Sequence, residues 1–143
     1  MTTRIYDFNE VQASFAGIPI DGWADGDGIT ITRESDAFTS VVGLKGEVAR
    51  SKTNDNRATI EFNLMSTSPT NAALSAVALA DREAPGGAGI GALLIVDLNG
   101  TSLFTCGNSW LKRVPDPVFG REASTRTWTF EVDELRDFNG GNL

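Results

Sequence analysis

The chain has 143 residues, of which 41% are hydrophobic and 22% charged, and this predicts one globular domain spanning residues 1–143. It contains no histidine and a single cysteine, Cys106, which excludes Ser–His and Cys–His catalysis, histidine metal sites, intrachain disulfides and thiolate-rich zinc sites. A net charge of −7 argues against a protein that grips DNA through its phosphates, although DNA could still slide along such a surface.

The sequence lacks the signals of a membrane or export segment. Its longest candidate, the apolar run at residues 92–96, is far shorter than the roughly 20 apolar residues that span a bilayer. The opening MTTRIYDFNE has no apolar run of signal-peptide length. We therefore expect no membrane insertion by this chain, and assembly in the cytosol.

Short strands are predicted along the first third of the chain, where apolar and polar residues alternate. Ile5, Tyr6 and Phe8 predict the start of a first strand. Further strands are predicted at residues 11–15, 29–32 and 38–42. Between them, Asp21, Asp25 and Asp27 could form a calcium site, but the loop lacks the EF-hand pattern. Because Asp and Gly are common turn formers, a turn is favoured there.

A polar segment from about 43 to 57 predicts a protruding hairpin arm, because it contains little to bury. Its centre, SKTNDN, is predicted to be the turn at the tip. The next strand alternates clearly. Ala58, Ile60, Phe62 and Leu64 are expected to face a core, and the residues between them to face outward.

A helix is predicted after this strand, with Ser68 as its N-cap and Pro69 at its first position. Residues 72–80 are apolar except for Ser75. A helix that is apolar nearly all round needs cover on more than one side. Either a second layer or a neighbouring subunit would provide it, and an ordinary core helix in a monomer remains the alternative.

The second half predicts a hairpin and one long closing strand. Asn99-Gly100 is a strong hairpin signal and should join antiparallel strands at about 92–98 and 101–106. A bulge is predicted at residues 106–109, where Cys106 is expected to pack as a small, at least partly buried residue. Residues 127–133 are predicted to form the last alternating strand, and DFNGGNL to be a loose end or a segment ordered by a partner.

These elements predict a mainly β fold: an antiparallel β-barrel or two-sheet sandwich with one packed α-helix. Glu61, Glu131 and Asp133 could be combined into the carboxylate pair of a glycosidase. They lie among threonines, however, with no aromatic residue in register to stack a sugar. We therefore expect no enzymatic activity and no cofactor.

Three runs of the sequence resemble the tail tube proteins of bacteriophages with contractile tails. They are VVGLKGEVARSKTNDNRATIEFNLMSTSPTNAAL, SWLKRVPDPVFGREASTRTWTFEV and the closing FNGGN, and the resemblance covers roughly residues 7–142. It implies a structural protein of the virion, assembled in the host cytoplasm, whose copies form hexameric rings stacked into a tube. The implied partners are the protein itself, the tail sheath protein around the tube, and the tape measure protein and DNA within the lumen.

The resemblance also gives candidate site residues. Alternation together with the resemblance predicts a neutral-to-acidic lumen wall, free of exposed aromatics and of a row of arginines, formed by Thr59, Glu61, Asn63, Thr127, Thr129 and Glu131. In tail tube proteins the long loop reaches the next ring, although such an arm on its own is usually a solvated hairpin end. The expected contacts between rings or subunits involve Lys45, Glu47, Arg50, Lys52, Asp55, Arg57, Leu74 and Val77.

Two other functions remain open from the sequence. A secretion-system tube protein would have the same architecture but would carry effectors instead of DNA. A small β-barrel that binds a ligand or carbohydrate would stay monomeric and have a concave apolar pocket with a few polar groups.

Overall fold

A computed structural model of the chain describes residues 3–142. The described part contains ten strands, one α-helix and a short 3-10 turn. The turn η1 spans Phe8–Glu10 and the helix α1 spans Thr70–Glu83. The strands are β1 (Val11–Phe15), β2 (Ile18–Ile20), β3 (Ile29–Arg33), β4 (Phe38–Val42), β5 (Val48–Lys52), β6 (Ala58–Met65), β7 (Gly91–Asp97), β8 (Leu103–Arg113), β9 (Thr125–Val132) and β10 (Arg136–Phe138).

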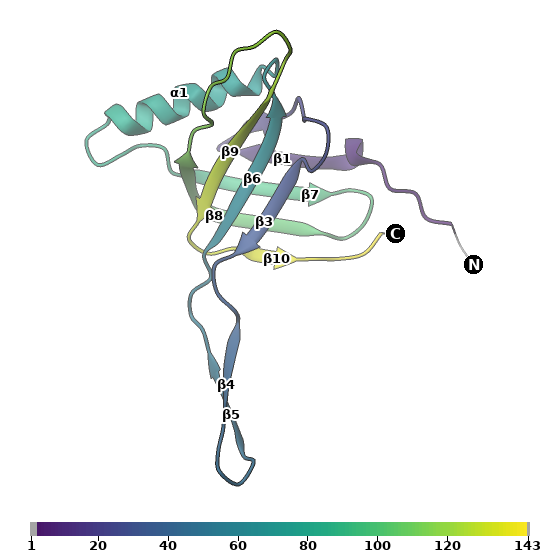
Figure 1. Cartoon of the computed structure of the whole chain (residues 1–143), viewed down its shortest axis with the longest axis vertical. Helices are drawn as coiled ribbons and strands as arrows, with labels where there is room; N and C mark the ends of the chain where they lie inside the picture. Colours follow the sequence, from purple (N-terminus) through teal and green to yellow (C-terminus); the bar gives the residue numbers. More distant parts are fainter. Residues whose placement is uncertain (1–2, 143) are drawn as a thin grey trace.

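Eight of the strands form one antiparallel sheet that folds into two crossing layers. The order is β2-β1-β7-β8-β9-β6-β3, and β10 pairs with β8. In Figure 1 the layer of β3, β6 and β9 crosses in front of β1, β7 and β8. Strand β8 belongs to both layers, because its first half pairs with β7 and its second half with β9. The predicted mainly β fold with one helix is confirmed.

The core lies between the two layers and is built by the alternation seen in the sequence. The inward residues of β6 are buried, as are those of β9 from Trp128 to Val132, and the outward ones are not. Phe130 packs against Phe15 and Phe62, with ring centroids 4.8 and 5.4 Å apart. The predicted inward face of the β6 strand is therefore confirmed, and each of its four residues is fully buried.

Helix α1 lies across one end of the sandwich (Figure 1) and begins at Thr70 with Pro69 as its N-cap, one residue later than predicted. The Ser68 hydroxyl accepts a hydrogen bond from the backbone N–H of Thr70 at 3.2 Å and donates one to the Asp21 carbonyl at 2.6 Å. Ser68 thus ties the start of the helix to the loop after β2. Leu74 anchors the helix in the core and is fully buried.

A buried polar contact joins α1 to β9, and its loss should be measurable. The Trp128 indole N–H donates to the Asn71 side-chain oxygen at 2.8 Å, and the Asn71 amide donates to the Met65 carbonyl at 2.9 Å. Asn71→Ala leaves the indole N–H without its partner, so we expect a loss of about 1–3 kcal/mol in the free energy of unfolding. Urea denaturation measures it. The exposed Asn54 provides the control: Asn54→Ala should stay within about 0.5 kcal/mol of wild type. Equal stability of the two variants would contradict a stabilising role for the hydrogen bond between Trp128 and Asn71.

The hairpin and the bulge of the second half are also confirmed. Strands β7 and β8 pair antiparallel, and the register shifts where Gly91 faces Ser109 but Leu93 faces Cys106. The two ends of the chain differ from expectation. Ile5 and Tyr6 are exposed and form no strand. The closing segment is paired instead of loose, since β10 joins β8 and Asn142 bridges Gly100. Its final residue, Leu143, lies outside the part that the structure describes.

The arm is a two-stranded hairpin that projects away from the sandwich (Figure 1). Strands β4 and β5 pair with each other and, within residues 3–142, with no other strand. The turn lies at residues 43–47, where Gly46 has a positive φ of 88° that favours glycine. The prediction of a tip at SKTNDN is wrong, because that run contains the end of β5 and the return to the sandwich.

Candidate functional site

The six residues expected to line a lumen lie together on one surface. They form three cross-strand pairs on the outer face of β6 and β9, namely Thr59 with Glu131, Glu61 with Thr129, and Asn63 with Thr127. We call these six residues the polar sheet face. The pairing was not visible in the sequence, which gave the outward side of each strand but not the partner strand or its register.

The polar sheet face is held by hydrogen bonds among short side chains. The Thr127 hydroxyl donates to the Asn63 side-chain oxygen at 2.7 Å, and the Thr59 hydroxyl donates to Glu34. Strand β3 extends the surface with Thr30 opposite Glu61 and Thr32 opposite Thr59. The result is a wall of small polar groups, with Glu61 exposed near its centre.

Strand β8 adds two residues to this surface that the sequence analysis missed. Trp110 lies opposite Glu131, and Arg113 lies opposite Thr129. Trp110 is half-buried and Arg113 is exposed. The surface therefore continues beyond the six predicted residues and includes a half-buried aromatic and an arginine at its β8 border. The bulge at residues 106–109 and a second register shift between Leu111 and Arg113 hid the side on which these residues lie.

Asp55 and Arg57, two of the residues predicted to contact other rings or subunits, bind each other within the chain. Both lie beyond the arm, and the Arg57 guanidinium binds Asp55 through two nitrogens at 2.9 and 3.0 Å. Arg57 also approaches Glu131 at 3.7 Å, so it connects the base of the arm with the polar sheet face. Hydrogen bonds from the Arg57 side chain and backbone, and then from Ser35, hold the pKa of the Asp55 carboxyl far below its ordinary value.

This depressed pKa predicts a pH-dependent contribution to stability. The Asp55 carboxylate stabilises the folded chain above the pKa of an unfolded aspartate, about 3.9, and that stabilisation is lost as the pH falls further. Asp55→Asn should therefore be slightly less stable than wild type near pH 7, and the difference should shrink below pH about 4. Thermal melting from neutral to acidic pH measures it. A difference that stays constant across this range would contradict the prediction.

The arm presents apolar and basic side chains to solvent. Val41, Val42 and Val48 are each 67% exposed, and Leu44 at the tip is fully exposed. The charged candidates Lys45, Glu47, Arg50 and Lys52 are all exposed as well. The Arg50 guanidinium lies 4.0 Å from the centre of the Phe38 ring, so it covers that aromatic while remaining accessible.

The two helix candidates are not equivalent. Leu74 is fully buried in the core, so the expectation that it contacts another subunit is wrong for this fold. Val77 is half-buried and packs against the core from its edge. The exposed apolar side of α1 is formed instead by Leu79 and the alanines Ala72, Ala76 and Ala80.

The remaining chemical alternatives find little support. The carboxylates of Asp21 and Asp25 accept hydrogen bonds from the N–H groups of the glycines that follow them, at 2.8 and 3.0 Å, as in turns. Among residues 3–142 no group of three or more metal-binding side chains occurs. Cys106 is buried, as predicted. No helix in that part of the chain is long and apolar enough to cross a membrane.

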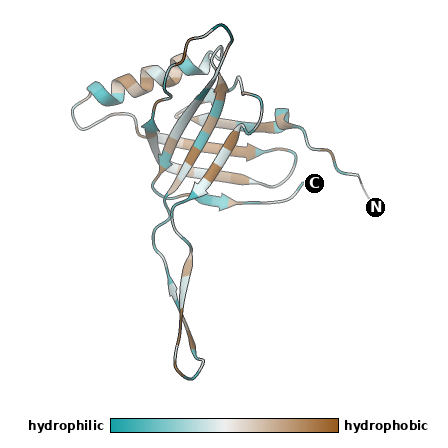
Figure 2. Ribbon diagram, viewed as in Figure 1, coloured by the Kyte–Doolittle hydropathy of each residue, from teal (hydrophilic) through white to brown (hydrophobic). Residues whose placement is uncertain are grey.

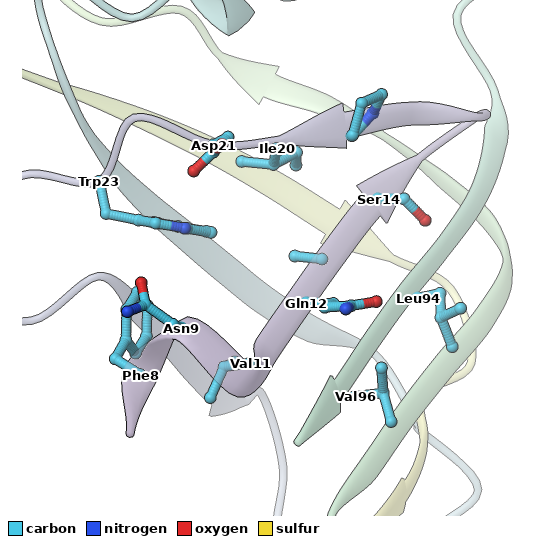
Figure 3. A pocket seen from close by; sticks show the side chains of 12 residues that line it. Phe8, Asn9, Val11, Gln12, Ser14, Ile20, Asp21, Trp23, Leu94 and Val96 are labelled. Atoms are coloured by element: carbon cyan, nitrogen blue, oxygen red, sulfur yellow. The ribbon is translucent and has the colours of Figure 1, made fainter. Parts of the chain in front are cut away.

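A ligand-binding module would need a concave apolar pocket, and Figure 3 shows a depression beside β1. It has a volume of about 400 Å³ and includes Gln12, Ser14, Asp21, Trp23 and Leu94 in its lining. Polar and apolar side chains are mixed along it, and the polar ones do not converge on one point (Figure 3). This arrangement gives no support to a built ligand site.

Comparison with known proteins finds a sequence relative in a bacteriophage and solved structures with a similar fold. The chain is 27% identical over 123 residues to "Structural protein ORF10" of Pseudomonas phage KPP10, covering 86% of this chain and 71% of that protein. The fold resembles the cap of the anti-feeding prophage, with a TM-score of 0.63, 8% identity and coverage of 96% of this chain and 93% of that one. It also resembles the PVC sheath–tube complex of an extracellular contractile injection system, with a TM-score of 0.62, 9% identity and coverage of 94% and 91%.

The family comparison covers almost the whole sequence. The profile of the family described as bacteriophage PhiTE tail tube protein matches residues 1–140. That range contains the sandwich, the arm, the helix and the complete polar sheet face. The chain therefore belongs to the PhiTE tail tube protein family, and its role is that of a structural component of a phage tail tube.

Proposed function

We propose that copies of this chain form hexameric rings that stack into a tube, and that the tube conducts DNA during ejection. The observation that carries the proposal is the polar sheet face, where six short polar or acidic side chains lie on one open surface of the sheet. A conduit needs a wall that does not hold its cargo. Basic side chains would bind phosphates, and exposed aromatics would stack bases at about 1–3 kcal/mol each.

The electrostatics of the polar sheet face fit this requirement. Glu61 is exposed, and Glu131 is partly neutralised by Arg57 at 3.7 Å, so the wall is mildly acidic. Repeated around a ring, such a wall repels the DNA backbone weakly from all sides. Arg113 and Trp110 lie at the β8 border, where a neighbouring subunit in the ring would cover them.

The proposed partners follow from membership of the tail tube family and not from the geometry of this chain. A sheath protein would surround the tube, and a tape measure protein would occupy the lumen before DNA does. The assembly would form in the host cytoplasm and end in the virion. The PVC sheath–tube complex shares the fold, which supports a tube within a sheath without identifying what passes through it.

Negative-stain electron microscopy of the purified protein over a concentration series tests the proposal. We expect sixfold rings, and tubes at higher concentration, with a central channel wide enough for duplex DNA. Featureless monomers at every concentration, also after addition of preformed tail fragments as seeds, would reject it. A channel too narrow for duplex DNA would reject the conduit while retaining the ring.

The same fold in extracellular contractile injection systems favours one alternative, a tube that carries protein effectors. The cargo found inside the tubes distinguishes a DNA conduit from an effector-carrying tube. Nuclease-protected DNA inside tubes from disrupted particles would support the DNA conduit, and protected protein without DNA would support the alternative.

A further inference from the structure

A groove opens at the side of the sandwich, between β3 and the β7–β8 hairpin. Its floor is apolar and includes Trp23, Ile29, Ile31 and Phe104, and its volume is about 630 Å³. Its lining contains the carboxylates Asp25, Asp27 and Asp97 and, among residues 3–142, no lysine or arginine. We call this surface the acidic groove.

The arm has the complementary character. Its strands and turn, residues 38–52, carry three basic residues and one acidic residue, in a chain whose net charge is −7. The same segment exposes Val41, Val42, Leu44 and Val48. Figure 2 shows these hydrophobic stretches along both strands of the hairpin. The arm therefore offers an apolar tip bordered by positive charge, and the acidic groove offers an apolar floor bordered by negative charge.

The arm needs a partner surface. A two-stranded hairpin on its own is marginally stable in water, and its exposed valines and leucine gain from burial. It points away from the sandwich (Figure 1), and its strands pair with nothing else in the described chain. Its own sandwich does not cover it, so a surface that buries these side chains would belong to another molecule.

We propose that the arm of one copy docks in the acidic groove of a second copy. The apolar tip covers the floor formed by Ile29, Ile31 and Phe104, while Lys45, Arg50 and Lys52 approach Asp25, Asp27 and Asp97. Because the two surfaces differ, this contact is heterologous and repeats from copy to copy, as a ring or filament requires. The inference rests on the proposed tube and names the surface that receives the arm.

Disulfide trapping between full-length copies tests the contact. One variant carries Leu44→Cys, and the other carries Ala24→Cys or Ser102→Cys, two positions that line the acidic groove. The native Cys106 is buried, so the parent protein serves as a blank. In oxidised mixtures we expect the heterodimer yield at one or both groove positions to exceed, by about tenfold, the yield with Ser75→Cys on the exposed side of α1.

Charge reversal provides the second measurement. Asp27→Lys in the groove copy should reduce trapping several-fold, and Lys45→Glu in the arm copy should restore part of it. Trapping equal to the Ser75→Cys control at both groove positions overturns the proposal, whether or not tubes form. If wild type forms tubes but the cysteine pairs do not trap, the tube stands and the docking fails. Trapping in a protein that forms no tubes, even with seeds, supports the docking and rejects the tube.

Discussion

Leu44→Asp should abolish tube assembly while leaving the subunit folded. Leu44 is fully exposed at the tip of the arm, so the substitution removes no contact within the chain. Once the arm is covered by a second copy, the new carboxylate would be buried without a partner, at a cost of several kcal/mol for every contact in the tube. Electron microscopy and sedimentation measure assembly, and circular dichroism with thermal melting measures the fold.

The matched control for this prediction is Leu44→Met, which keeps an apolar side chain of similar volume and should still assemble. A weaker effect is expected from Lys45→Gln, because exposed ion pairs contribute about 0–1 kcal/mol each. Normal tubes from Leu44→Asp would mean that the arm tip stays in solvent after assembly. A lowered melting temperature of the free subunit would mean that the arm contacts its own chain.

Glu61→Lys should leave tubes intact but make them hold DNA. The substitution changes the charge by two units per subunit, or about twelve per hexameric ring, on the surface proposed to face the cargo. Phosphate contacts of this kind are strongly salt-dependent, so tubes of the variant should bind duplex DNA at low salt and release it at high salt. Phage carrying the variant should adsorb normally and eject DNA slowly, with a loss of infectivity.

Glu83→Lys is the control, because it makes the same charge change on an exposed residue at the C-terminal end of α1, outside the polar sheet face. Filter binding of DNA to assembled tubes and ejection kinetics should separate the two variants. Unchanged ejection by Glu61→Lys, or equal slowing by both variants, would place the lumen on another surface. Glu131→Lys is a less clean test, since it would also set a lysine beside Arg57.

The parts of the fold that could be predicted are those with one buried face. In β6 and β9 the core imposes a period of two, and the sequence displays it from Ala58 to Leu64. The arm shows the limit of this argument. Neither side of β5 is buried, so its sequence VARSK shows no alternation of apolar and polar residues and resembles a loop. The polar run SKTNDN is the stronger signal for a turn. The actual turn depends on Gly43 and Gly46.

The site was less predictable than the fold because it depends on contacts between distant segments. Arg57 lies outward of the core as alternation predicts, but its partners Asp55 and Glu131 follow from the path of the chain after β5 and from the β6–β9 register. Leu74 looked like any other residue of an apolar helix, and burial alone distinguishes it from Leu79. Trp110 lies on the polar sheet face because the bulge at residues 106–109 changes which side of β8 points outward.

The isolated position of the arm has a kinetic consequence for assembly. Two free subunits that meet can cover one arm between them, and the other arm stays in water with its valines exposed. A subunit that adds to the end of a tube, on a completed ring, contacts several neighbours at once. It buries more apolar surface for the same loss of translational and rotational freedom. Elongation of an existing tube is therefore favoured over nucleation of a new one. Polymerisation of the pure protein should show a lag and a critical concentration, and preformed tube fragments should remove the lag.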